Sequence, residues 1–217
     1  GLETAGCLDH DENVSYLLLG DFRDGPSETE ADDAEILDAV RRRIRAMNER
    51  AGREKYFYLH RRRTFYAPDS RWMGRERKRG ALMQFGDLVL RHDSSAFRGI
   101  WGETGEPKYV ITLDSDSILV DARRLVGMME HPYNADVNVM SLSMRARISS
   151  LVTPFARFLC GDKGYSRYAC GHSLSFDAYG LGNYTGKGIY RVAAFDKILR
   201  YALPENRVLS HDMLEGA

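Results

Sequence analysis

Short hydrophobic segments alternate with longer helical patterns along most of the chain, and this alternation restricts the fold more than any other feature of the sequence. The segments with the length and composition of buried strands are residues 16–19, 56–60 and 109–113. Apolar residues recur at helical spacing after each of them, in residues 36–47, 81–89 and 125–129. Further elements are expected at a strand over 137–142, a helix over 155–159, a strand over 188–191 and a helix over 192–201. This order predicts an α/β fold with a mainly parallel sheet flanked by helices.

The composition is that of an ordinary globular protein. The chain has 217 residues, of which 43% are hydrophobic, and it carries 31 basic and 31 acidic side chains. We therefore expect a single domain over residues 1–217, with a poorly defined N-terminal segment over residues 1–13. A formal net charge of zero argues against nucleic acid as a partner, because proteins that neutralise a phosphate backbone usually carry a basic surplus.

Polar side chains follow the predicted strands. Asp21 comes just after the first strand, His60 ends the second, and Asp114 and Asp116 follow the third. Ligands of parallel α/β sheets gather at the carboxyl ends of the strands, so these residues are candidates for one site. Asp21 alone has two interpretations: it accepts hydrogen bonds from a nucleobase or ribose, or it is a turn or cap residue before a helix.

The pair Asp114 and Asp116 is the strongest single motif. Two carboxylates separated by one residue can turn toward the same ligand once the chain leaves a strand. Carboxylate oxygens suit Mg²⁺ or Mn²⁺, and such a cation usually completes its coordination shell with substrate phosphates. The alternative is that both aspartates merely favour a strand end and its turn. Position alone does not decide between the two.

A basic cluster lies just before the second helical pattern and consists of Arg75, Arg77, Lys78 and Arg79. It suits a diphosphate, because the first turn of a helix also attracts anions. A solvated charged face and a nucleic-acid contact are the alternative interpretations.

Residues 161–188 are rich in glycine, tyrosine and serine without a clear period, which predicts a mobile active-site loop. The end of this segment, Gly186-Lys187-Gly188, lacks the frame of a phosphate-binding P-loop, and its glycines allow the backbone to approach a ligand closely. Near the end of the chain, His211 and Asp212 follow another short hydrophobic segment. They offer a candidate base, and a helix-capping aspartate is the alternative.

Four segments, taken in order, resemble the glycosyltransferase domain of bacterial cyclic β-1,2-glucan synthases. These segments are residues 72–82 (WMGRERKRGAL), 109–117 (YVITLDSDS), 185–190 (TGKGIY) and 204–216 (PENRVLSHDMLEG). Residues 16–26 and 56–63 also match in type and order, so the likeness covers the chain from about residue 14 to its end. The family is similar to the cellulose-synthase-like processive inverting glycosyltransferases, which implies a GT-A-like, Rossmann-like fold.

The resemblance implies a metal-dependent inverting glucosyltransferase that transfers glucose from UDP-glucose to a growing β-1,2-glucan acceptor. In this resemblance Asp212 is the catalytic base. The implied donor-binding residues are Asp21, Lys78, Arg79 and Asp114. The implied ligands of Mg or Mn are Asp114 and Asp116. The implied acceptor or loop residues are Gly186, Lys187 and Gly188. The alternative is a non-catalytic module that keeps the α/β scaffold and binds a nucleotide sugar or a polyanion.

The family extends beyond both ends of the matching region. Its fold has a strand before residue 16, and its chain continues after the base motif into an acceptor segment and membrane helices. We therefore expect a domain that is incomplete at both ends and belongs to a larger membrane-bound synthase at the cytoplasmic face of the bacterial inner membrane. No hydrophobic run approaches the roughly 18 residues that cross a bilayer, so this piece itself is expected to be soluble. We also expect it to elongate glucan poorly or not at all by itself.

Overall fold

A computed structural model of the chain describes residues 11–115, 117–119, 121–142, 152–160 and 186–202, together with Glu3, Gly6 and Ala178. The strands are β1 (Tyr16–Gly20), β2 (Tyr56–Arg61), β3 (Thr64–Tyr66), β4 (Arg71–Met73), β5 (Phe97–Trp101), β6 (Tyr109–Thr112), β7 (Val139–Ser141) and β8 (Gly188–Arg191). The helices are α2 (Asp33–Ala51), α3 (Arg77–Arg91), α4 (Ala122–Glu130), α5 (Pro154–Cys160) and α7 (Val192–Ala202). Within the described residues, every strand and helix expected from the sequence is confirmed, α5 included, and β3, β4 and β5 are additional.

The described strands form three small sheets. One has the order β1-β2-β5, another β6-β8-β7, and the third is the hairpin β3-β4. β1 and β2 run parallel, whereas the pairs β2–β5, β3–β4, β6–β8 and β7–β8 are antiparallel. The expectation of one mainly parallel sheet is therefore wrong for the described part of the chain.

The reversal at β5 has a local cause. The backbone N–H of Arg62, just after β2, donates to the carbonyl of Ala96, just before β5. α3 thus returns the chain to the end of β2, and β5 must run back along it. Hydrophobic spacing indicates that a strand exists but carries no information about its direction.

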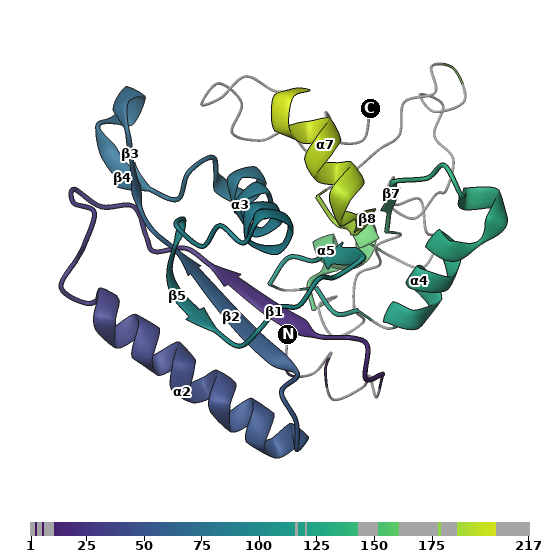
Figure 1. Ribbon diagram of the computed structural model, residues 1–217, viewed down its shortest axis with the longest axis horizontal. Helices are drawn as coiled ribbons and strands as arrows, with labels where there is room; N and C mark the ends of the chain where they lie inside the picture. Colours follow the sequence, from purple (N-terminus) through teal and green to yellow (C-terminus); the bar gives the residue numbers. More distant parts are fainter. Residues whose placement is uncertain are drawn as a thin grey trace.

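Helices cover both faces of the β1-β2-β5 sheet (Figure 1). α2 lies on one face, where Ile44 and Met47 pack against aromatic side chains of the strands, namely Tyr16, Tyr56 and Tyr58. α3 lies on the other face. Successive side chains of a strand point to opposite faces, so Tyr58 contacts the α2 cluster while Leu59 contacts the α3 cluster.

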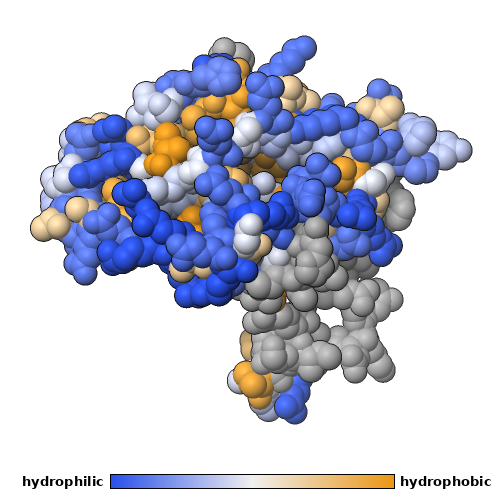
Figure 2. Space-filling model, turned by 60° about the horizontal axis from the view of Figure 1, so that its bottom comes forward, coloured by the Kyte–Doolittle hydropathy of each residue, from blue (hydrophilic) through white to orange (hydrophobic). Residues whose placement is uncertain are grey.

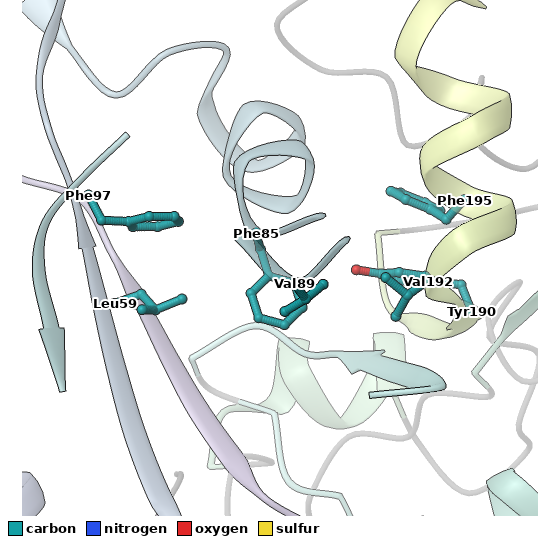
Figure 3. Packing of buried hydrophobic residues seen from close by; sticks show 7 residues of the cluster. All are labelled: Leu59, Phe85, Val89, Phe97, Tyr190, Val192 and Phe195. Carbon is teal, nitrogen blue, oxygen red and sulfur yellow. The ribbon is translucent and has the colours of Figure 1, made fainter. Parts of the chain in front are cut away.

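The larger core cluster joins the two three-stranded sheets through α3 (Figure 3). It consists of Leu59, Phe85, Val89, Phe97, Tyr190, Val192 and Phe195. Phe85 and Val89 of α3 lie between the strand residues Leu59 and Phe97 on one side and the β8–α7 residues on the other. The position of α3 therefore depends on both sheets.

Ion pairs between α3 and α7 reinforce this packing. The buried carboxylate of Asp196 accepts from Arg91 and Arg200, and Arg200 also donates to Asp87 at 2.6 Å. Burial opposes ionisation of Asp196, but the hydrogen bonds from Arg91 and Arg200 outweigh it and hold its pKa below the usual range. α7 is therefore held close to α3, which matters because α3 carries the predicted site residues Lys78 and Arg79 in its first turn, and α7 directly follows β8, which begins at Gly188.

The surface in Figure 2 is largely hydrophilic, in keeping with a composition that is 29% charged. Among the described residues, no helix combines the length and the apolar character that crossing a membrane requires. Most of the segment 1–13 lies outside the described residues. So does most of the expected loop over 161–188, of which the structure describes Ala178 and residues 186–188.

His60 is buried in the core and gives the protein an expected pH dependence. Its side chain is 3% exposed, its ring lies 3.8 Å from that of Phe22, and its Nδ1 meets the Tyr58 hydroxyl. Among the described residues Nε2 has no hydrogen-bond partner. Burial lowers the pKa of His60 from 6.5 to about 4.

Because the folded state disfavours the charged imidazole, the unfolded chain binds the proton more tightly between pH 6.5 and about 4. We expect the free energy of unfolding to fall by roughly 2 to 3 kcal/mol when the pH drops from 7.5 to 4.5. Urea denaturation at both pH values measures this loss. His60→Gln should remove most of it, and His131→Gln, at an exposed position, should leave it intact. An equal loss in His60→Gln would assign the effect to other groups.

Candidate functional site

Asp114 lies two residues beyond the end of β6 and is held between two lysines. Its Oδ1 accepts from Lys78 Nζ at 2.8 Å, and its Oδ2 lies 2.6 Å from Lys187 Nζ. The side chain of Asp114 is 41% exposed, so the cluster remains open to solvent. Three of the predicted site residues, from three separate motifs, thus meet at one point.

Pairing between β6 and β8 explains how motifs so distant in sequence come together. Thr112 pairs with Gly188 in the antiparallel register, and the Gly188 backbone N–H donates to the Thr112 hydroxyl at 3.2 Å. Residues just before β8 must therefore lie beside residues just after β6. Lys78 also donates to the Gly186 carbonyl at 2.6 Å, so the first turn of α3 contacts the same loop.

The charges of this cluster favour an ionised carboxylate. Burial opposes ionisation of Asp114, but hydrogen bonds from Lys187 and Lys78 outweigh it and hold the pKa of Asp114 below its usual range. Two ammonium groups face one carboxylate, which leaves a local surplus of positive charge. Such a surplus suits an anion, or an anion that arrives with a metal ion.

Asp21 belongs to a second part of the site, at the end of β1. Both of its carboxylate oxygens accept from Arg61, from Nε and from Nη2, at 2.5 Å each. Arg61 is 1% exposed and the Asp21 side chain 37%, so the pair has a buried side and an open side. Asp21 therefore keeps lone pairs that a ligand could use.

Arg61 links this part to the loop that carries the basic cluster. Its remaining N–H groups donate to the carbonyls of Arg75 (2.8 Å) and Arg77 (2.9 Å) and to Gln84 Oε1 (3.0 Å). All five donors of the guanidinium are thus in use. The loop precedes Lys78 directly, so a continuous chain of contacts runs from Asp21 through Arg61 to Lys78 and on to Asp114.

The loop before α3 has an unusual backbone that two glycines permit. Glu76 and Arg77 both have left-handed φ values, 50° and 53°, which typically cost about 1 kcal/mol or more per residue outside glycine. A Cβ at Gly80 would lie 1.9 Å from the Arg75 carbonyl oxygen. A Cβ at Gly74 would lie 2.6 Å from Arg61 Nη2 and 2.7 Å from Asp21 Oδ2. Both glycines are therefore required for this close approach.

A buried ion pair fixes the loop that follows Asp21. Arg63 donates to Asp33 Oδ2 at 2.7 Å and to the carbonyls of Arg23 and Glu28. Asp33 is fully buried, and Arg98 also donates to it at 2.9 Å. Burial opposes ionisation of Asp33, but the bonds from Arg63 and the Glu30 backbone outweigh it, and the pKa of Asp33 lies below its usual value.

Arg79 takes a different place from the one that the basic cluster suggested. Its side chain is 2% exposed and pairs with Glu76, so it points into the protein. Arg77 pairs with Asp24 at 2.8 Å and 3.0 Å on the surface. This arrangement does not support direct contact between Arg79 and a ligand. Of the adjacent residues Lys78 and Arg79, it is Lys78 that faces the cluster around Asp114.

Two predicted residues, Asp116 and Asp212, lie outside the described residues, so their roles as metal ligand and base stay predictions. Within the described part of the chain, no three histidine, cysteine, aspartate or glutamate side chains form a group that could hold a metal ion. Asp114 is the predicted ligand found there, and each of its oxygens bonds to a lysine. A divalent cation can bind this carboxylate if the two lysines release the carboxylate and pair with another anion instead.

Sequence reasoning missed the role of Arg61 and the contact of Lys187 with Asp114. Arg61 begins a run of three arginines directly after a strand, which was a signal for a functional arginine at that strand end. Nothing local to Lys187 indicates its partner, because the contact depends on the pairing of β6 with β8.

Comparison with known proteins gives one close match to a curated sequence. No family model matches the chain. The chain is 37% identical, over an alignment of 226 residues, to the cyclic β-(1,2)-glucan synthase NdvB of Rhizobium meliloti (strain 1021). The match covers 94% of this chain and 8% of that protein, so the chain spans less than a tenth of the length of its relative.

Proposed function

The chain is related to cyclic β-(1,2)-glucan synthase, and from this premise we propose that it is part of a metal-dependent inverting glucosyltransferase domain. Its donor is UDP-glucose and its acceptor is a growing β-1,2-glucan chain. The observation that carries the proposal is the position of Asp114 between Lys78 and Lys187 at the end of β6. A carboxylate for a cation and two ammonium groups for phosphates are the groups that a nucleoside diphosphate sugar requires.

Each part of the site has a role in this proposal. Asp21, fixed by Arg61, hydrogen-bonds the uridine through the open side of its carboxylate. Asp114 and Asp116 are the ligands for Mg or Mn, which neutralises charge on the leaving UDP when bound. Asp212 takes the proton of the acceptor hydroxyl as its oxygen attacks the anomeric carbon. This single displacement inverts the configuration at that carbon and needs one base.

The short span of the match favours a domain that is part of a longer protein. Since the chain matches 8% of its relative, we propose that it belongs to a larger synthase. That synthase is membrane-bound, with this domain on the cytoplasmic face of the bacterial inner membrane. The acceptor then reaches the site in part through residues beyond this chain. Accordingly, the 217 residues alone should elongate glucan poorly or not at all, and efficient polymer synthesis by them would contradict this setting.

Substitution of the base tests the proposed chemistry in the full-length protein. We expect Asp212→Asn to lower the rate of glucosyl transfer at least about 100-fold, because an amide cannot accept the hydroxyl proton. Calorimetric titration should show UDP-glucose binding within about twofold of the unsubstituted protein, since a base contributes to the chemical step rather than to donor binding. Unchanged transfer would refute the base. Retained binding without any transfer by the unsubstituted protein would instead indicate a nucleotide-sugar-binding module.

A further inference from the structure

Lys187 enters the proposed function as one of two ammonium groups for phosphates, yet in the free protein it contacts the central carboxylate of the site. Its Nζ lies 2.6 Å from Asp114 Oδ2, and its side chain is 21% exposed. Lys78 occupies the other oxygen of Asp114 and also bonds to the carbonyl of Gly186, the residue before Lys187. The two lysines are therefore neighbours on one carboxylate, although 108 residues separate Lys78 from Gly186.

The ion pairs around Asp114 are more exposed to solvent than the buried ion pair that stabilises the fold. Arg63 and Asp33 are 1% and 0% exposed and hold a loop together, whereas the side chains of Lys78 and Asp114 are 39% and 41% exposed. Ion pairs that are open to solvent contribute little to stability, so a ligand can replace them readily. A compact ammonium group on a flexible stem also moves more easily than a forked guanidinium.

A divalent cation and the lysines compete for the same atoms. Each oxygen of Asp114 already bonds to an ammonium group, and a cation that binds there must displace at least one of them. A displaced lysine needs a new anion close by. The phosphates of a nucleoside diphosphate supply one, because the same cation would hold them at the carboxylate.

We propose that Lys187 is a diphosphate-binding residue, which together with Lys78 neutralises Asp114 in the free protein and moves to the phosphates when a divalent cation takes that carboxylate. This inference rests on the proposed function and assigns a further residue to its donor site. Lys78 keeps the loop before β8 close through Gly186, so Lys187 stays near any phosphate that binds at this carboxylate. Without ligand, the carboxylate of Asp114 is thus neutralised by the two lysines, and nucleotide and cation bind cooperatively.

Replacement of Lys187 should have opposite effects on the binding of cation and nucleotide. In the full-length protein without nucleotide, Lys187→Ala removes a competitor for Asp114, so the affinity for Mn²⁺ should rise about threefold or more. With saturating Mg²⁺, the same change removes a charge-assisted bond to phosphate, so the affinity for UDP should fall about tenfold or more. Electron paramagnetic resonance of free Mn²⁺ and calorimetric titration of UDP measure the two effects.

Matched variants separate this exchange from a loss of structure. Lys197→Ala, at an exposed lysine on α7, should change neither affinity. Lys187→Met keeps the aliphatic stem and should reproduce both effects, and Lys187→Arg should restore most of the UDP affinity. Uridine, which lacks phosphates, should bind all variants equally.

The outcomes distinguish this inference from the proposed function. If the unsubstituted protein binds UDP with Mg²⁺ and Lys187→Met leaves that affinity unchanged, the inference is overturned and the donor site stands. Weaker binding of both Mn²⁺ and UDP in Lys187→Met would also overturn it, because a purely structural role predicts effects of the same sign. If the unsubstituted protein binds no UDP, the proposed function fails, and no phosphate then remains for Lys187 to bind.

Discussion

Replacing Arg61 with methionine should lower the free energy of unfolding by about 3 kcal/mol. The substitution leaves Asp21 and the carbonyls of Arg75 and Arg77 without their shared donor, and Arg61 itself is almost fully buried. Water can solvate the open side of Asp21, which limits the loss to the lower end of the range for a broken buried pair. Urea denaturation should show a lower midpoint at an unchanged slope.

Two further variants show whether geometry or charge is responsible. Arg61→Lys keeps the charge but cannot supply five donors in one plane, so we expect it to lose most of the same stability. Arg62→Met, at the exposed neighbouring position, should stay within about 0.5 kcal/mol of the unsubstituted protein. Full stability of Arg61→Lys would show that the network of hydrogen bonds is not what holds the loop.

Substitution of Arg61 should also weaken donor binding, because Arg61 holds both Asp21 and the backbone just before Lys78 in place. We expect UDP affinity in Arg61→Lys to fall about tenfold even at temperatures where the variant is fully folded, since displacement of a binding group weakens its hydrogen bond to the ligand.

Asp114→Asn should lower glucosyl transfer by the full-length protein about 1,000-fold. The amide is a poor ligand for a hard cation, and bound metal contributes several kcal/mol to the neutralisation of a leaving diphosphate. The loss should fall mainly on kcat/KM, and excess Mn²⁺ should restore little of it.

Nucleotide binding in this variant should respond differently from catalysis. Asp114→Asn releases Lys78 and Lys187 from their carboxylate, so UDP should bind at least as tightly as to the unsubstituted protein when no cation is present. The increase in affinity on addition of Mg²⁺ should disappear. Asp136→Asn, at an exposed aspartate, serves as the control for loss of one negative charge. Transfer at the normal rate by Asp114→Asn would remove this residue from the metal site.

The parts of the fold that could be predicted are those with a contiguous pattern. β1, β2, β6 and β8 are short apolar runs, and α2, α3, α4 and α7 have apolar residues at helical spacing. β5 has the sequence FRGIW, with an arginine and a glycine among its five residues, so it lacks such a pattern. Its place beside β2, and its direction, follow from the path of α3 rather than from its own residues.

The site shows the same division between local and distant information. Lys78, Asp114 and Lys187 were each marked by their own motif, but their meeting depends on the pairing of β6 with β8. Neighbouring helical residues point about 100° apart, so one of the adjacent residues Lys78 and Arg79 faces the site while the other faces the interior. A cluster of like charges in a sequence cannot show which of its members do so.

Calorimetric titration of UDP into the full-length protein, with and without Mg²⁺, tests the central claim most directly. The claim is that the cluster of Asp114, Lys78 and Lys187 binds a nucleoside diphosphate together with a divalent cation. We predict that Mg²⁺ raises the affinity for UDP at least about tenfold, through the charge-assisted bonds that the cation makes available, and that EDTA reverses the increase. Binding of UDP that is equally tight with and without cation, or no binding of UDP by the folded protein, would contradict it.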